Sequence, residues 1–161
     1  MRPALAPDPT PADAALIPLA AAGRADVFFF GTLAHAAVLA RVLDRPLGPL
    51  DRVPAALPGY RRVRAKGASY PVLVPAPGRR VEGFLLKRPG PRDIRRINHF
   101  ESDEYEALHL PIAGGGRAWA FVGLDALPPT DEPWDLDAWT RAHMPAYLAE
   151  VVDYWMADAP G

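Results

Sequence analysis

The feature that most constrains this chain is an apolar strand that stops abruptly. Residues 26–33 read Asp-Val-Phe-Phe-Phe-Gly-Thr-Leu, so four apolar residues precede Gly31 and Thr32. This run predicts a buried strand over 26–31, and residues 34–44 have the periodicity of a helix. A strand that breaks into a helix aims backbone N–H groups at one spot. We therefore expect a small-molecule site at this turn, able to hold a carboxylate or a phosphate.

Length and composition narrow the class of protein. The 161 residues suit one domain with its own core, and half of them are apolar. The formal net charge of −1 gives no global attraction to nucleic acid or to an anionic membrane. No cysteine is present, which excludes disulfides, thiolate metal sites and cysteine nucleophiles and fits a reducing compartment. We expect a cytoplasmic protein, monomeric or homodimeric, that binds neither nucleic acid nor membrane.

The domain organisation is predicted to be a leader followed by one domain. Residues 1–24 are rich in proline and alanine and are read as flexible. A signal peptide is a less favoured alternative, because acidic residues and prolines precede the short apolar run 14–22 and no basic segment does. Residues 25–158 are assigned to the domain.

The middle of the chain is dominated by short strands and turn residues. Pro91 stands where a helix over 92–101 would begin, and a long helix is expected over 133–156 with a kink at Pro145. Turns are expected at the dipeptides 58–59 and 77–78 and at the glycines 114–116. The remaining strands are expected at 51–57, 60–65, 72–74, 81–86, 105–112 and 118–122. This order predicts an α+β fold with a curled or barrel-like mixed sheet and flanking helices.

Glu101 is the candidate for acid–base chemistry. Ile94, Ile97 and Glu101 share one face of the predicted helix, so a carboxylate ends an otherwise apolar stripe. Burial and the negative end of the helix dipole would both raise its pKa toward the range of a general base or acid. The alternative is that the helix end frays and Glu101 turns to water.

The other ionisable residues favour structural roles. The acidic residues after Glu101 are read as a solvated turn, and the four histidines lack the spacing of a metal site. The basic residues after Tyr60 alternate in sequence, which is typical of one charged strand face. These three sets are Asp103, Glu104 and Glu106; His35, His99, His109 and His143; and Arg61, Arg62, Arg64 and Lys66.

Five short motifs occur in order between residues 26 and 122. They are Phe30-Gly31-Thr32-Leu33, Leu57-Pro58-Gly59-Tyr60, Tyr70-Pro71-Val72-Leu73, Val81-Glu82-Gly83-Phe84, and Ile97-Asn98-His99-Phe100-Glu101 with Tyr105 four residues further on. Together they resemble the γ-glutamylcyclotransferase-like, or AIG2-like, family. The chain is most similar to the cyclotransferase-like module of some bacterial tellurite-resistance proteins.

The resemblance implies a β-barrel-like fold with flanking helices and a cofactor-independent reaction without a metal. A γ-glutamyl amine or peptide cyclises to 5-oxoproline and releases the amine. It implies that Glu101 is the general acid–base, and that Phe30, Gly31, Thr32 and Leu33 hold the glutamyl end through backbone N–H groups. It implies that Tyr105 is a pocket wall or a hydrogen-bond donor.

Three positions depart from the family pattern. Phe30 stands where relatives carry tyrosine, Asn98 where they carry aspartate, and Ala107 where an arginine is frequent. Because Glu101 is retained, we expect an enzyme whose substrate preference can differ. The alternative is a non-catalytic binding or stress-related module that keeps the pocket.

Overall fold

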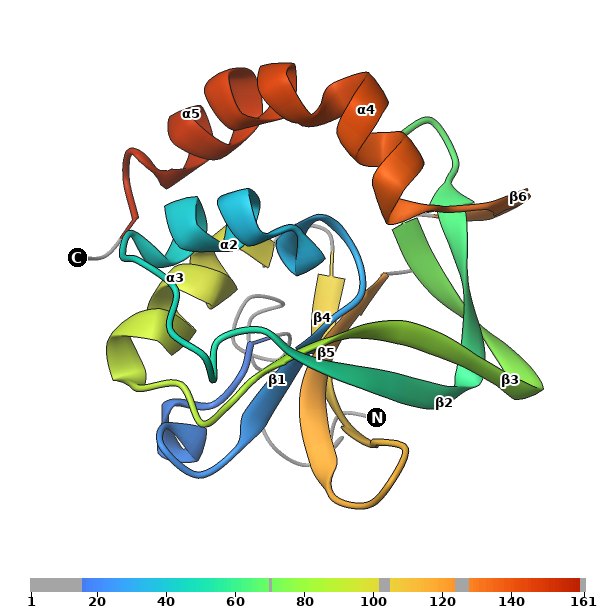
Figure 1. Ribbon diagram of the computed structural model, residues 1–161, viewed down its shortest axis with the longest axis horizontal. Helices are drawn as coiled ribbons and strands as arrows, with labels where there is room; N and C mark the ends of the chain where they lie inside the picture. Colours follow the sequence, from blue (N-terminus) through green and yellow to red (C-terminus); the bar gives the residue numbers. More distant parts are fainter. Residues whose placement is uncertain (1–15, 70, 102–104, 124–127, 160–161) are drawn as a thin grey trace, which may run out of the picture.

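A six-stranded mixed sheet forms the centre of the computed structural model, which describes residues 16–69, 71–101, 105–123 and 128–159 (Figure 1). The spatial order of the strands is β4-β5-β1-β3-β2-β6. All pairs are antiparallel except β1 with β5. The strands are β1 (Asp26–Phe29), β2 (Val53–Ala65), β3 (Pro71–Leu86), β4 (Tyr105–Pro111), β5 (Arg117–Gly123) and β6 (Pro129–Pro133). The predicted α+β fold with a curled mixed sheet is confirmed.

β1 is buried on both faces, which explains its unbroken apolar sequence. Val27 and Phe29 belong to the large core between the sheet and the helices. Phe28 and Phe30 belong to a second cluster on the opposite face, inside the curl of the sheet. The strand ends at Phe29, earlier than the predicted residue 31, and a 3₁₀ turn over Thr32–Ala34 (η2) follows.

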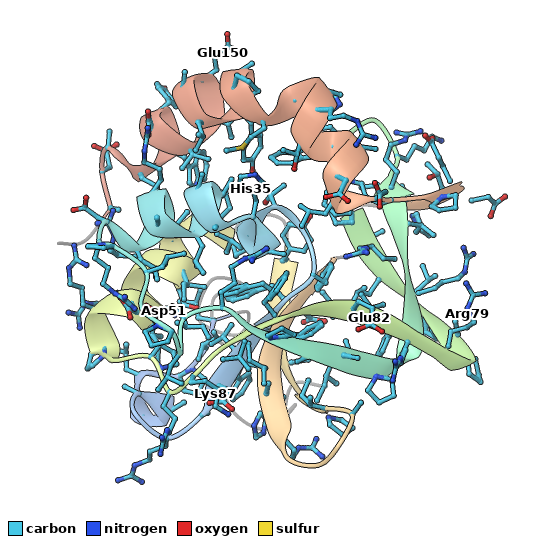
Figure 2. All side chains as sticks on the ribbon, viewed as in Figure 1. His35, Asp51, Arg79, Glu82, Lys87 and Glu150 are labelled. Carbon is cyan, nitrogen blue, oxygen red and sulfur yellow. The ribbon has the colours of Figure 1, made fainter. Side chains whose placement is uncertain are left out.

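The two turns predicted in the middle of the chain are instead bulges inside two long strands. β2 and β3 form one hairpin in which Pro58 pairs with Arg80 and Tyr60 pairs with Pro75. Gly59 thus lies opposite residues 76–79, and its φ of 88° requires glycine. The bulge bends the hairpin, and Arg79 projects from this outer bend (Figure 2). The prediction of separate strands was wrong because both segments pair with a distant partner.

The helices lie on one side of the sheet, with the C-terminal helical segment arching over α2 (Figure 1). The long C-terminal helix begins at Leu136 and not at 133, because 129–133 pairs with β2 as β6, which the sequence did not reveal. Pro145 lies inside this segment, and a π-helical turn follows it. The helices are α2 (Ala36–Leu43), α3 (Pro91–Glu101), α4 (Leu136–Tyr147), the π turn η3 (Leu148–Val152) and α5 (Asp153–Met156).

Arginines fix α3 against the C-terminal end of α2. Arg92 Nη1 donates to the Leu43 carbonyl and Arg96 Nε donates to the Val42 carbonyl, both at 2.6 Å. These carbonyls have no partner within α2, so the two side chains cap the helix. Arg45 adds ion pairs to Asp51 at 2.8 Å and to Asp93 at 2.7 Å. α3, which carries Glu101, is therefore held at several points.

The N-terminal segment that the structure describes is also tied to α3. Residues 16–24 were assigned to the leader, but Ile17 is buried in the main core. Ile17 N–H donates to Asn98 Oδ1 at 2.9 Å, and Asn98 Nδ2 donates to the Ile17 carbonyl at 3.0 Å. An aspartate carboxylate at position 98 could accept the hydrogen bond from Ile17 N–H but could not donate one to the Ile17 carbonyl. The asparagine therefore makes a second hydrogen bond that an aspartate could not make. Residues 1–15 lie outside the described residues.

Gly83 is predicted to be essential for the contact between β1 and β3. A Cβ at this position would collide with the Phe29 carbonyl oxygen and would lie 2.7 Å from Phe28 Cζ. Both neighbours are in the core and cannot move aside. We expect Gly83→Ala to lower the free energy of unfolding by about 2–3 kcal/mol, measured by urea denaturation.

Gly90→Ala is the matched control, because a Cβ there meets nothing within 4 Å. We expect it to change the free energy of unfolding by less than about 1 kcal/mol. Equal stability of the two variants would contradict the close approach of β1 and β3.

The Arg45–Asp51 pair predicts a pH-dependent contribution to stability. The hydrogen bond from Arg45 lowers the pKa of Asp51 below its ordinary value, against a smaller opposing effect of burial. A lowered folded-state pKa stabilises the fold above the unfolded-state pKa, and this stabilisation is lost as pH falls through the folded-state value. We expect Asp51→Asn to cost roughly 1–2 kcal/mol at pH 7 and progressively less below about pH 4.

Urea unfolding at a series of pH values measures this effect. Asp44→Asn is the control, because the Asp44 carboxylate is exposed and its pair with Arg92 is longer, at 3.3 Å. A cost of Asp51→Asn that stays constant down to pH 2 would contradict the assignment.

Candidate active site

A small pocket lies at the C-terminal end of β1. Its walls come from β1 and the η2 turn, the first residue of β3, the last residue of α3, and strands β4 and β5. Counted with its open mouth, it has about 320 Å³ of empty space. The described residues that line it are Phe28, Phe29, Phe30, Gly31, Thr32, Leu33, Pro71, Glu101, Tyr105 and Phe121. All six site residues predicted from the sequence line this pocket.

The turn after β1 has backbone N–H groups that find no partner among the described turns and loops. The Gly31 and Thr32 carbonyls accept hydrogen bonds from Ala34 and His35 N–H, at 2.9 and 3.1 Å. In contrast, the amides of Gly31, Thr32 and Leu33 donate no backbone hydrogen bond of the described turns and loops, and no side chain caps η2. Buried N–H groups normally find a partner. The N–H groups of this turn can therefore donate hydrogen bonds to an anionic or carbonyl group of a ligand.

Glycine is favoured at position 31 by a close contact with Pro71, because its φ of −114° is open to any residue. A Cβ at Gly31 would lie 3.0 Å from Pro71 Cγ and 3.2 Å from Pro71 Cδ. The first residue of β3 thus packs directly on the turn. The Gly-Thr and Tyr-Pro motifs, 40 residues apart in sequence, meet at this contact.

Glu101 is the one carboxylate among the described lining residues, and no lysine or arginine is among them. Ile94 and Ile97 are buried at 1% and 0% exposure, so the predicted apolar face of α3 is confirmed. Glu101 ends this face, is half-buried, and faces the pocket from α3 while the turn of residues 31–33 faces it from β1. The acidic residues 102–104 lie outside the described residues.

Tyr105 forms part of the pocket wall. Its hydroxyl donates to the Pro71 carbonyl at 2.8 Å, which ties β4 to the start of β3. Phe30 also contributes to the wall while its ring lies 6.5 Å from that of Phe28 in the second core cluster. A phenylalanine at position 30 therefore suits an apolar environment on one side and the pocket on the other.

Two arginines, Arg52 just before β2 and Arg62 within it, hold the two ends of the turn. Arg62 Nη1 donates to the Phe30 carbonyl at 2.6 Å, and Arg52 Nε donates to the Ala34 carbonyl at 2.7 Å. The alternation of Arg62, Arg64 and Lys66 predicted one charged strand face, but it did not predict the contact of Arg62 with the turn. Its spacing gives no signal that separates it from Arg64, because both lie on the same face of β2.

His35 follows the turn and caps α2 (Figure 2). Its Nδ1 accepts from Ala37 N–H at 3.1 Å, which needs an unprotonated nitrogen. Burial, and then the charge of Arg52, lower the pKa of His35 below its ordinary value, so the neutral form is favoured.

In the part of the chain that the structure describes, no three His, Asp or Glu residues gather as metal ligands. None of its helices is long and apolar enough to cross a membrane.

The arrangement defines a class of protein: a curled α+β sheet with a backbone cradle facing one carboxylate. The model of the family described as gamma-glutamyl cyclotransferase, AIG2-like, matches residues 27–141. This range contains the whole pocket. The chain belongs to this family.

The relatives found by sequence and by structure agree with this membership. Protein AIG2 C of Arabidopsis thaliana is 26% identical over 130 residues, covering 76% of each chain. AIG2-like protein C of the same plant is 32% identical over 87 residues, which is 54% of this chain and 49% of that protein. A solution structure of an Arabidopsis thaliana protein superposes with a TM-score of 0.58 at 25% identity, covering 78% of this chain and 86% of the other. A second superposes with a TM-score of 0.59 at 24% identity, covering 82% of each.

Proposed function

We propose that the protein is a γ-glutamylcyclotransferase-type enzyme that converts a γ-glutamyl amine or peptide to 5-oxoproline and a free amine. The observation that carries the proposal is that Glu101 lines the same pocket as residues 31–33, whose amides donate no backbone hydrogen bond of the described turns and loops. Family membership supports the same reaction class. The reaction needs a base, a place for the glutamyl end and no cofactor.

The proposed reaction is an intramolecular acyl transfer. The Glu101 carboxylate takes a proton from the substrate α-amine, whose nitrogen attacks the γ-carbonyl carbon. A bond forms between these two atoms, and the bond from the γ-carbon to the leaving nitrogen breaks. Glu101 returns the proton to the leaving nitrogen, so the group is unchanged after each turnover. The cradle holds the α-carboxylate, and this fixes the amine and the carbonyl close to each other.

The surroundings of Glu101 support a role in proton transfer. The carboxylate lies at the end of a buried helix face and beside the aromatic walls supplied by Phe30, Tyr105 and Phe121. A carboxylate that lines the pocket can take a proton from a bound ligand and return it to another atom of that ligand.

Glu101→Gln is predicted to abolish catalysis while the fold is kept. The amide has the same shape but cannot accept the proton of the α-amine. We expect release of 5-oxoproline to fall by at least about 100-fold, because general acid–base catalysis contributes 10²–10⁴-fold. The measurement is chromatographic detection of 5-oxoproline from a panel of γ-glutamyl amines and peptides.

Glu106→Gln is the control, because Glu106 follows Tyr105 on β4 but does not line the pocket. We expect its activity to stay near that of the unchanged protein. Turnover by Glu101→Gln equal to that of the control would rule out Glu101 as the base. If the unchanged protein releases no 5-oxoproline from any member of the panel, the non-catalytic alternative is favoured.

A further inference from the structure

Arg62 lies behind the pocket, at the point where two strands separate. Pairing between β1 and β3 ends at Phe29 and Phe84. Beyond these residues, Arg62 Nη1 donates to the Phe30 carbonyl at 2.6 Å and to the Glu82 carbonyl at 3.3 Å. One guanidinium nitrogen therefore bridges the residue after β1 and the interior of β3, just past the last β1–β3 pair. Figure 2 labels Glu82 on this part of β3.

The Arg62 guanidinium is largely buried beside an open groove that Glu82 and Asp135 also line, and it makes no ion pair with a described residue. Its Nε is buried and has no hydrogen-bond partner there, and the Trp134 ring lies 5.3 Å from its central carbon. Burial lowers the pKa of Arg62, with smaller opposing effects from Asp135 and Glu82. A buried cation that no carboxylate neutralises directly is costly. Its positive charge therefore acts mainly on the Phe30 and Glu82 carbonyls, to which it donates hydrogen bonds.

The described walls of the pocket supply no positively charged side chain. Its described lining includes the Glu101 carboxylate and no lysine or arginine. A ligand carboxylate bound in the same pocket would be repelled by the ionised side chain of Glu101. A positive charge behind the amides that hold the ligand carboxylate would offset this repulsion.

The Phe30 carbonyl and the Gly31 N–H belong to the same peptide unit. A charged donor on the carbonyl oxygen polarises the unit and makes its N–H a stronger donor, because hydrogen bonds in a chain reinforce one another. Arg62 thus acts on the Gly31 amide through one peptide bond. It also fixes the orientation of that peptide in the pocket wall.

We propose that Arg62 is a positioning residue that orients and polarises the Phe30–Gly31 peptide, and so makes the pocket selective for γ-glutamyl compounds with a free α-carboxylate. The selectivity part of this proposal rests on the proposed function. The orientation of the peptide does not, because it follows from the contact between Arg62 and the Phe30 carbonyl. The two parts can therefore fail separately.

The experiment compares two γ-glutamyl anilides, one with a free α-carboxylate and one with an α-carboxamide. Arg62→Met removes the charge and keeps much of the apolar bulk. We expect the KM for the carboxylate substrate to rise about 10- to 100-fold, as for loss of a charge-assisted hydrogen bond. Activity toward the carboxamide should change less than about 3-fold. Arg62→Lys should restore part of the loss, because it keeps a charge without the planar fork.

Arg64→Met is the matched control. Arg64 lies on the same face of β2 and makes comparable polar contacts, to Glu132 at 2.8 Å and to the Ala65 and Ala68 carbonyls at 3.1 Å. It touches no atom of the turn, so both substrates should be processed as by the unchanged protein. Equal losses on both substrates in Arg62→Met, or the same pattern in Arg64→Met, would overturn the selectivity.

A second measurement separates this proposal from the enzymatic activity. In ¹⁵N–¹H NMR spectra, the Gly31 amide should shift upfield in Arg62→Met and remain in place in Arg64→Met, since a weaker donor is less deshielded. If the protein turns over no γ-glutamyl compound but the Gly31 shift is seen, the proposed function fails and the positioning role stands. An unmoved Gly31 amide overturns the positioning role. If Arg62→Met does not fold, Arg62→Lys gives both readings at smaller amplitude, because it keeps the charge but loses the planar fork.

Discussion

The burial of β1 on both faces is the constraint on which the rest of the structure depends. Val27 and Phe29 face the helices, Phe28 and Phe30 face the inside of the curled sheet, and both edges are paired. A strand enclosed in this way cannot shift its register without exposing aromatic rings. The turn at Gly31 and Thr32 therefore follows a strand that is buried on both faces and paired along both edges, which suits a site for accurate positioning.

The elements around the pocket are fixed by polar contacts that span long sequence separations. Arg52 and Arg62 hold the carbonyls at the two ends of the turn, and Tyr105 holds the Pro71 carbonyl that lies beside it. α3 is fixed through its arginines on α2 and through Asn98 on Ile17. The pocket walls are thus set by side chains that reach backbone carbonyls, and Glu101 is the one charged residue among the described lining residues.

The sequence was sufficient to predict what depends on local pattern. The apolar run before Gly31, the stripe of Ile94, Ile97 and Glu101, and the hairpin of β4 and β5 all have clear periodicity, and the ordered motifs brought the six pocket residues together. The sequence could not predict features that depend on contacts between residues far apart in the chain. Pro58-Gly59 and Pro77-Gly78 have the composition of turns but oppose each other as a bulge. Arg62 and Arg64 differ only in what the folded chain places beside them.

The central claim is that the turn after β1 holds the α-carboxylate of a γ-glutamyl group while Glu101 faces its amine. A crystal structure of Glu101→Gln with an uncleaved γ-glutamyl anilide tests this directly. The account predicts the α-carboxylate within hydrogen-bond distance of the amides of residues 31–33, and the α-amine next to the side chain at position 101. A ligand bound in the reverse orientation, or outside this pocket, would contradict it.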